Sequence, residues 1–283
     1  MTTTTSAPAH TATSLTAPAQ TTGDQLRWNE PAGIPARGTV VVLTGRGETS
    51  EVYQRFGHRI ASDAYRVVVV PTDFASEGAG IPTSSVDPAV EAILADPATV
   101  RPVVLVGSDA GALHARRLAD LHPSDVAGIV LAGVPVAPRG TTADVDREIA
   151  ARTACPNHRK VLSTAIRSAL FATPLPLTEL GPNGAPQEHV ALPVLAIHGE
   201  ADELSPLAHA LAVHATLGTP EVTVVIGGLH DILNDLTHRT VAAAVVTFLE
   251  RVRVDPTAAP LTRTVAVPAP AAEAPSTSGT PTS

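Results

Sequence analysis

The segment that most restricts the fold of this chain is Gly107-Ser108-Asp109-Ala110-Gly111, which stands between two apolar runs. The first run, residues 102–106, reads Pro-Val-Val-Leu-Val and predicts a strand, while residues 112–121 predict a helix. Small residues on both sides of the central aspartate allow a sharp turn between the two elements. We therefore expect Asp109 to be held on a strained turn at the end of a buried strand.

Strand-like and helix-like patterns alternate along most of the chain. The expected strands are 40–43, 67–70, 102–106, 126–131, 194–197 and 222–226. The expected helices are 51–64, 86–94, 112–121, 144–153, 160–171, 207–217 and 241–252. The continuous β-branched run at 67–70 is typical of a strand buried on both faces. The alternation predicts an α/β fold with a mostly parallel, doubly wound sheet and right-handed crossovers.

The two ends of the chain differ from its centre in composition, because they are rich in Thr, Ala, Pro and Ser. Such segments bury too little apolar surface to offset the entropy lost on ordering. We expect residues 1–22 and 255–283 to be disordered tails, with one domain over 23–254. Within it, about 135–190 has no strand pattern of its own. An insertion at the carboxyl edge of such a sheet covers the usual ligand crevice, so we interpret this segment as a short lid.

Composition narrows the classes of partner. The formal net charge is -8, which argues against a nucleic-acid partner or an anionic membrane. No apolar stretch approaches the roughly 18 residues that a membrane span needs. Residues 1–20 lack the basic start and apolar centre of a secretory signal, so we expect a cytoplasmic protein. Hydrophobic residues make up 44% and aromatic residues 2%, which predicts an aliphatic core and, with the lid, an apolar small-molecule substrate.

From about residue 38 to residue 251, the order of features resembles the α/β-hydrolase fold family. The resemblance rests on the turn at 45–48, the pentapeptide around Asp109, and the segments 198–202 and 227–231. Each follows a predicted strand, and the members of a catalytic triad occur in the family's chain order. The resemblance implies an α/β-hydrolase fold with a nucleophile elbow.

The resemblance also implies a role for each member of the triad. Asp109 stands at the nucleophile position, and His230 stands where the family has its general base. Asp202 would orient that histidine and stabilise the imidazolium. The sequence leaves open that Asp202 instead caps the following helix, with Glu200 or Glu203 as the acid.

The turn at residues 44–48, followed by Tyr53, is similar to that of monoacylglycerol-lipase and lysophospholipase-like members of the family. In that branch the residue after the first glycine of the turn donates a backbone N–H to an oxyanion hole. The resemblance therefore implies that the backbone N–H groups of Arg46 and Ala110 form this hole. Each such donor is typically worth about 3 kcal/mol of barrier.

An aspartate at the elbow favours chemistry at a saturated carbon. Its carboxylate is already ionised at neutral pH. Attack on an ester carbonyl would give a mixed anhydride, whereas attack on a saturated carbon gives an alkyl ester that water, activated by His230, can hydrolyse. This is the logic of the family's Asp-nucleophile branch, which includes haloalkane dehalogenases, haloacid-type dehalogenases and epoxide hydrolases. We therefore expect a cofactor-free hydrolase that opens an epoxide or a carbon–halogen bond through an aspartyl ester.

The chain departs from that branch in its aromatic residues. Ala110 stands where the branch usually has a tryptophan, and the single tryptophan, Trp28, lies near the N-terminal end. The two tyrosines, Tyr53 and Tyr65, lie outside the expected lid, so no lid tyrosine can protonate an opening ring. The side chains left to supply a proton or a positive charge are those of His158, His189 and Arg46.

Other functions remain open at the level of sequence. Asp109 and His230 could act as acid and base in a lyase, dehydratase or isomerase without a covalent step. An esterase built on Ser108 would require a shifted turn, and a ligand-binding protein could use an inactive hydrolase scaffold. We expect no metal and no cofactor, because the chain has no HExxH, CxxC or clustered carboxylate pattern.

Overall fold

A computed structural model describes residues 20–22, 25–72, 85–136, 144–166, 170–171, 175, 190–217, 220–255, 257 and 261. Its described strands form one eight-stranded sheet in the order β1-β2-β4-β3-β5-β6-β7-β8. The strands are β1 (Gln20–Thr22), β2 (Gln25–Trp28), β3 (Thr39–Leu43), β4 (Arg66–Val70), β5 (Val103–Ser108), β6 (Gly128–Ala132), β7 (Val194–Gly199) and β8 (Glu221–Val225). Among these strands the β1–β2 and β2–β4 pairs are antiparallel and the other pairs are parallel. The expected α/β class with a mostly parallel sheet is confirmed.

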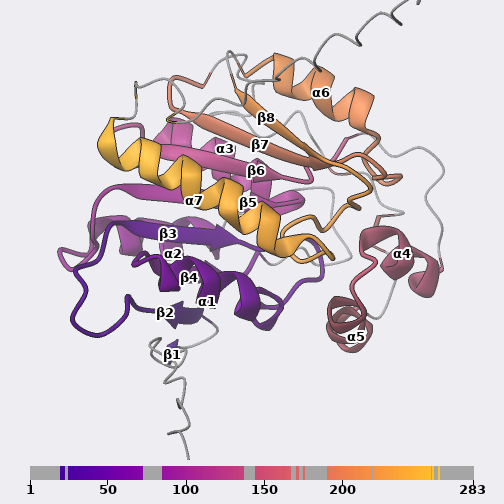
Figure 1. Cartoon of the computed structure of the whole chain (residues 1–283), viewed down its shortest axis with the longest axis horizontal. Helices are drawn as coiled ribbons and strands as arrows, with labels where there is room; N and C mark the ends of the chain where they lie inside the picture. Colours follow the sequence, from indigo (N-terminus) through magenta and orange to yellow (C-terminus); the bar gives the residue numbers. More distant parts are fainter. Residues whose placement is uncertain are drawn as a thin grey trace, which may run out of the picture.

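Helices cover both faces of this sheet (Figure 1). The described helices are the 3-10 helix η1 (Ser50–Tyr53) and the α-helices α1 (Gln54–Ser62), α2 (Val86–Ala95), α3 (Ala110–Leu121), α4 (Val145–Arg152), α5 (Pro156–Ala165), α6 (Leu207–Ala215) and α7 (His238–Val254). Helices α1 and α7 lie in front of the sheet, and α2 and α3 lie behind it. The arrangement is the doubly wound one that the sequence predicts.

The core is divided by the sheet because successive side chains of a strand point to opposite faces. In β3, Val40 and Val42 join the cluster that contains α1 and α7, while Val41 and Leu43 join the cluster that contains α2 and α3. All four side chains are buried, as expected for a central strand of a sheet covered on both sides. The valine runs of the sequence therefore contribute to two cores, and the one on the side of α1 and α7 also contains aromatic side chains.

Two strands were not predicted from the sequence. Strand β2 pairs antiparallel with β4, and its alternation of partly buried and buried residues ends at the buried Trp28. Strand β1 pairs with β2, so residues 20–22 belong to the sheet rather than to the N-terminal tail. The prediction of disorder for the remaining tail residues concerns positions outside the described residues, except 255, 257 and 261.

The described part of the expected lid consists mainly of α4 and α5, which lie together beside the sheet (Figure 1). The Asp144 side chain caps α4 by accepting hydrogen bonds from two backbone N–H groups, and Pro156 occupies the first turn of α5. The two helices share a small apolar cluster of Ile149, Leu162 and Ile166. None of the described helices combines the length and apolarity that a bilayer crossing requires.

Candidate active site

The turn between β5 and α3 holds Asp109 in a strained backbone conformation, with φ 48° and ψ -118°. Both flanking glycines are required by close backbone contacts. A Cβ atom at Gly107 would lie 2.2 Å from the carbonyl oxygen of Gly111, and one at Gly111 would lie 2.2 Å from that of Leu43. The sharp turn that the sequence predicts is therefore present, and it places the Asp109 side chain beyond the carboxyl end of β5.

The structure brings together the three residues expected to form a triad. His230, in the loop after β8, has Nε2 3.3 Å from Oδ1 of Asp109. Its Nδ1 lies 2.7 Å from Oδ2 of Asp202, which follows β7. The imidazole thus lies between two carboxylates, and all three side chains are buried.

Asp202 faces the imidazole and does not cap the following helix α6, whose N-cap residue is Pro206. Its Oδ1 accepts hydrogen bonds from the backbone N–H groups of Leu204 at 2.9 Å and Ser205 at 2.8 Å, while Oδ2 faces the imidazole. The neighbouring acids are used differently, since Glu200 accepts from the Gly227 N–H at 3.3 Å and Glu203 is exposed. The loop bonds fix Asp202 against His230.

Arg46 makes three hydrogen bonds to the elbow aspartate. Its backbone N–H, which the resemblance assigns to an oxyanion hole, donates to Oδ2 of Asp109 at 3.0 Å. Its guanidinium also donates to both carboxylate oxygens, with Nε 2.8 Å from Oδ2 and Nη2 2.8 Å from Oδ1. The sequence did not predict this ion pair. Ala110 opens α3, so its backbone N–H is among those with no acceptor inside the helix.

Phe171, from the segment expected to form the lid, covers this group. The Arg46 guanidinium carbon lies 3.7 Å from the centre of the Phe171 ring, a cation–π arrangement. The same ring meets the His230 imidazole edge to face, with centroids 4.9 Å apart. A single aromatic side chain therefore shields the ion pair and the imidazole from water.

The electrostatics of the triad follow from this burial and pairing. Burial opposes ionisation of Asp109, but Arg46 and His230 outweigh it and hold the pKa of Asp109 well below its usual range. Burial lowers the pKa of His230, yet the facing carboxylates of Asp202 and Asp109 raise that pKa to about 10. At neutral pH the resting site therefore holds two carboxylates, one guanidinium and an imidazolium.

The raised pKa of His230 predicts a stability change at alkaline pH. The folded protein binds this proton more tightly than the unfolded chain, where a histidine has a pKa near 6.5. The stabilising contribution is therefore complete below pH ~6.5 and lost as the pH rises towards about 10. We expect urea unfolding between these pH values to show a steeper decline for the natural protein than for His230→Gln. If the unfolding free energies of the two proteins changed with pH in parallel, the raised pKa of His230 would be contradicted.

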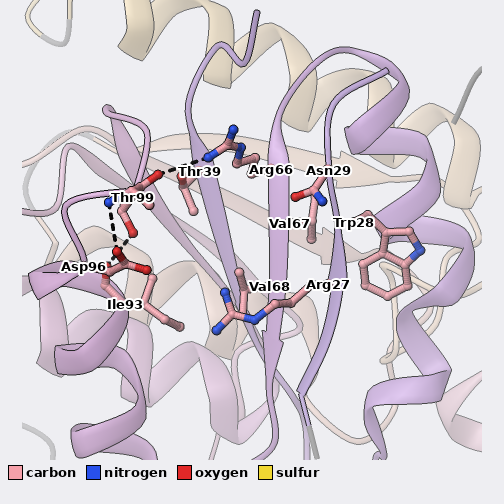
Figure 2. Close-up of a pocket in the computed structure, with 11 residues that line it drawn as sticks. Arg27, Trp28, Asn29, Thr39, Arg66, Val67, Val68, Ile93, Asp96 and Thr99 are labelled. Carbon is pink, nitrogen blue, oxygen red and sulfur yellow. Dashed lines mark hydrogen bonds between the residues drawn. The ribbon is translucent and has the colours of Figure 1, made fainter. Parts of the chain in front are cut away.

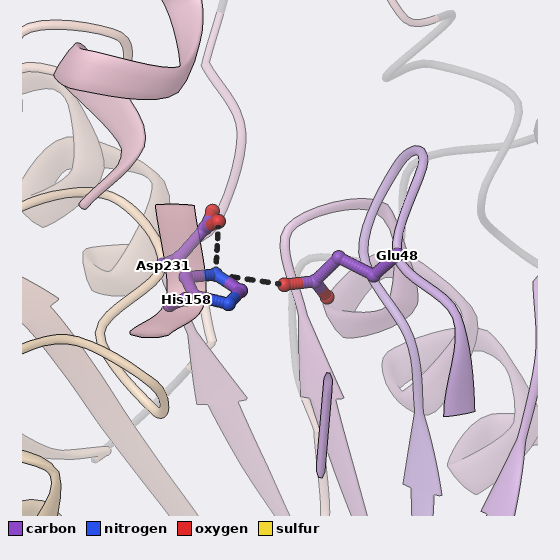
Figure 3. Close-up of side chains that lie close together, drawn as sticks. All are labelled: Glu48, His158 and Asp231. Atoms are coloured by element: carbon purple, nitrogen blue, oxygen red, sulfur yellow. Dashed lines mark hydrogen bonds and ion pairs between the residues drawn. The ribbon is translucent and has the colours of Figure 1, made fainter. Parts of the chain in front are cut away.

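A second buried charge cluster lies beside the triad and joins α4 and α5 to the loop that carries Arg46. We call it the Arg152 cluster; it consists of Arg152, Glu48, His158 and Asp231. The Arg152 side chain is fully buried, with Nε 2.9 Å from Oδ2 of Asp231 and Nη1 donating at 2.9 Å to the backbone carbonyl of Arg46. His158 Nε2 lies 2.7 Å from Oδ2 of Asp231 and 3.7 Å from Oε1 of Glu48 (Figure 3).

Three members of this cluster have metal-ligating side chains. One ligand atom each from Glu48, His158 and Asp231 lie within 4.8 Å of one another. Arg152 already places a fixed positive charge there, 2.9 Å from Asp231 and 3.7 Å from Glu48. We therefore interpret the group as an ion-pair network that supports the Arg46 loop.

The remaining candidates from the sequence have other places in the structure. Ser108 ends β5, is buried, and hydrogen-bonds with the Tyr53 hydroxyl. Tyr53 in turn donates to Oε2 of Glu48 at 2.5 Å. Tyr65 donates to Glu250 of α7, and His189 lies outside the described residues. No sequence signal pointed to Phe171 or Arg152 as part of the site.

A separate pocket lies at the opposite edge of the sheet, where β3 and β4 begin (Figure 2). Its lining includes Thr39, Arg66, Asp96 and Thr99. Arg66 is held by a bidentate ion pair with Glu30, with both N–O distances at 2.8 Å. The lining of this pocket contains no member of the triad.

No protein-family model matches the chain, and no curated protein matches it in sequence. Solved structures do match. A monoacylglycerol lipase of Paleococcus ferrophilus is 16% identical with a TM-score of 0.61, covering 81% of this chain and 98% of its own. A soluble variant of a Saccharomyces cerevisiae monoglyceride lipase is 14% identical with a TM-score of 0.61, covering 88% and 99%. An esterase from Exiguobacterium antarcticum is 19% identical with a TM-score of 0.57, covering 80% and 96%.

Proposed function

Because this chain has the α/β-hydrolase fold, we propose that it is a hydrolase in which Asp109 attacks a saturated carbon and forms an aspartyl ester. The carbon would carry a halogen or belong to an epoxide ring, so that the leaving atom departs with its bonding electron pair. His230 would then activate water against the ester, and Asp202 would orient His230. The lipase and esterase activities named for the similar structures support hydrolysis as the class of reaction.

The observation that carries this proposal is the different environment of the two Asp109 oxygens. Oδ2 accepts the backbone N–H of Arg46 at 3.0 Å, whereas Oδ1 lies 3.3 Å from Nε2 of His230. If Oδ1 forms the new bond to carbon, Oδ2 becomes the carbonyl oxygen of the ester. That oxygen becomes an oxyanion when water attacks, and a backbone donor at 3.0 Å is positioned to stabilise it.

Ester formation also changes the proton affinity of His230. In the resting site two facing carboxylates raise the pKa of this imidazole. Esterification removes the negative charge of Asp109, so the pKa of His230 falls and its proton passes to solvent or to a basic leaving group. Neutral His230 can then take a proton from water as the water adds to the ester carbonyl. The tetrahedral intermediate then breaks its acyl C–O bond, and the departing product oxygen takes the proton from His230. Asp109 is left as a carboxylic acid, whose proton passes to His230 and restores the resting carboxylate and imidazolium.

Oxygen-18 labelling tests the covalent step. Excess protein is given 1-bromobutane, 1,2-epoxybutane or their carboxylate-bearing counterparts in oxygen-18 water for a single turnover. We expect the product to contain unlabelled oxygen from Asp109, and the peptide that holds Asp109 to gain one labelled atom. Asp109→Ala is the control and should show neither event.

Two other results would contradict the aspartyl ester. Label found in the product and not in the peptide would mean that water attacks the substrate directly. Turnover without addition of water, lost on Asp109→Ala, would support the acid–base lyase or isomerase alternative.

We further propose a small-molecule substrate and no nucleic-acid partner, because the net charge of -8 is unfavourable for binding phosphate backbones.

A further inference from the structure

The Arg46 guanidinium is hydrogen-bonded to both oxygens of Asp109, the carboxylate that is proposed to react. Nη2 donates to Oδ1 of Asp109 and Nε donates to Oδ2, each at 2.8 Å. The backbone N–H of Arg46 and Nε2 of His230 lie against the same two oxygens, at 3.0 and 3.3 Å. Both oxygens therefore have two donors, and a carboxylate so fully paired is a weak nucleophile. The reaction requires the guanidinium to release Asp109.

A released guanidinium needs another anion, because Arg46 is buried. Its side chain is 7% exposed and lies against the Phe171 ring. Removing one partner of a buried ion pair is strongly destabilising, because the remaining charge is left without compensation in a low-dielectric interior. The requirement persists after the first step, since the aspartyl ester carries no charge and would leave the cation without its partner. A substrate that brings its own anion satisfies the cation in both states.

We propose that the substrate carries a carboxylate, which replaces Asp109 as the bidentate partner of the Arg46 guanidinium. A planar guanidinium with two parallel N–H donors matches a carboxylate in this manner, and stacking on Phe171 fixes the plane of the fork. The ester intermediate then contains the ion pair of Arg46 with the substrate, beside a neutral His230 that remains hydrogen-bonded to Asp202. This inference rests on the proposed function and narrows the apolar substrate expected from the sequence to an organic acid with an electrophilic carbon.

One protein group competes with the substrate for this role. Glu148 of α4 is buried, its Oε2 accepts from the Phe171 N–H at 3.0 Å, and its Oε1 has no hydrogen-bond partner. Phe171 links the two side chains, since its backbone donates to Glu148 while its ring lies against the Arg46 guanidinium. If the guanidinium moved to Glu148 during the reaction, the substrate would need no charge. The experiment must therefore separate these two partners.

The test measures binding rather than turnover. Asp109→Asn keeps the shape of the side chain but removes its charge, so Arg46 loses its internal counterion. By calorimetry, we expect this variant to bind butyrate at least ~10-fold more tightly than butyramide, which has the same shape without the charge. We also expect it to bind butyrate more tightly than the natural protein does, because butyrate there competes with Asp109.

Two further variants test whether Arg46 is the group that binds the butyrate carboxylate. Adding Arg46→Met to Asp109→Asn should abolish the preference for butyrate, and adding Arg46→Lys, which keeps the charge but not the fork, should reduce it. Adding Arg147→Met, an exposed change on α4, should leave it unaltered. Thermal unfolding would show that each protein is folded, and the lysine variant decides the matter if the methionine variant is not.

Three results would overturn the proposal. Equal binding of butyrate and butyramide by Asp109→Asn would mean that the freed cation does not select anions. A preference that survives Arg46→Met would place the anion elsewhere. A preference that appears only when Glu148→Gln is added to Asp109→Asn would show that the freed Arg46 pairs with Glu148. Loss of the proposed covalent step would appear separately, as the failure of oxygen-18 to enter Asp109 while butyrate selectivity remains.

Discussion

Replacing His230 with glutamine is expected to stop the reaction after one half-turnover. The change removes the group that activates water but leaves Asp109 free to attack carbon. General base catalysis is worth about 10²–10⁴-fold, so steady-state turnover should fall by at least ~10²-fold. The aspartyl ester should accumulate, because its formation does not require a base. Intact-protein mass spectrometry should show one equivalent of the substrate's carbon fragment, and peptide analysis should locate it on Asp109.

His209→Gln is the matched control. His209 lies on α6, is partly exposed, and the sequence suggests no role for it, so turnover should be unchanged and no adduct should form. Loss of turnover in His230→Gln without an adduct, in a protein that unfolds as cooperatively as the natural one, would argue against the ester. It would instead favour an acid–base reaction that needs Asp109 and His230 together.

Replacing Arg152 with methionine is expected to lower the free energy of unfolding by about 3–5 kcal/mol. The Arg152 side chain has no exposed surface and lies within 4.0 Å of three carboxylates, those of Glu48, Glu148 and Asp231. Methionine fills a similar volume but leaves these acids without their shared cation. Urea unfolding at neutral pH, followed by circular dichroism, measures the loss.

Arg147→Met provides the control for that prediction, since it removes a guanidinium from the same helix. Arg147 is exposed, and surface substitutions of this kind usually change the unfolding free energy by no more than about 0.5 kcal/mol. If Arg152→Met cost no more than Arg147→Met, the buried acids would have to be compensated in some other manner, such as by taking up protons. The Arg152 cluster would then not be the ion-pair support that we infer.

Local sequence was informative wherever a feature depends on a few neighbouring residues. The elbow could be predicted because small residues surround Asp109 in a short pattern, and Gly107 is required by its contact with the Gly111 backbone in the same turn. Gly111 is required by the Leu43 backbone, a contact that the local pattern does not reveal. The positions of Asp202 and His230 followed because each comes directly after a strand with a clear apolar pattern. Boundaries were less accurate: α5 spans Pro156–Ala165 rather than 160–171, although Pro156 is itself a helix-start signal.

Features that depend on residues far apart in the chain could not be predicted from the sequence. Strand β2 is short, and its pairing with β4 brings together residues such as Leu26 and Val69. Its only local signal is the alternation that buries Leu26 and Trp28. The oxyanion position of Arg46 could be inferred from a motif, but the direction of its side chain could not. That direction depends on Asp109, 63 residues away.

The sequence by itself determined the layered α/β fold, the strained turn and the chain order of aspartate, acid and histidine. These rest on periodicity, glycine stereochemistry and strand ends, which are properties of short segments. Only the tertiary structure decided which charges share a buried volume, including Arg46 on Asp109 and Arg152 on Asp231, 79 residues away. An ion pair in a low-dielectric interior depends on distance in space, and folding sets that distance without regard to separation along the chain.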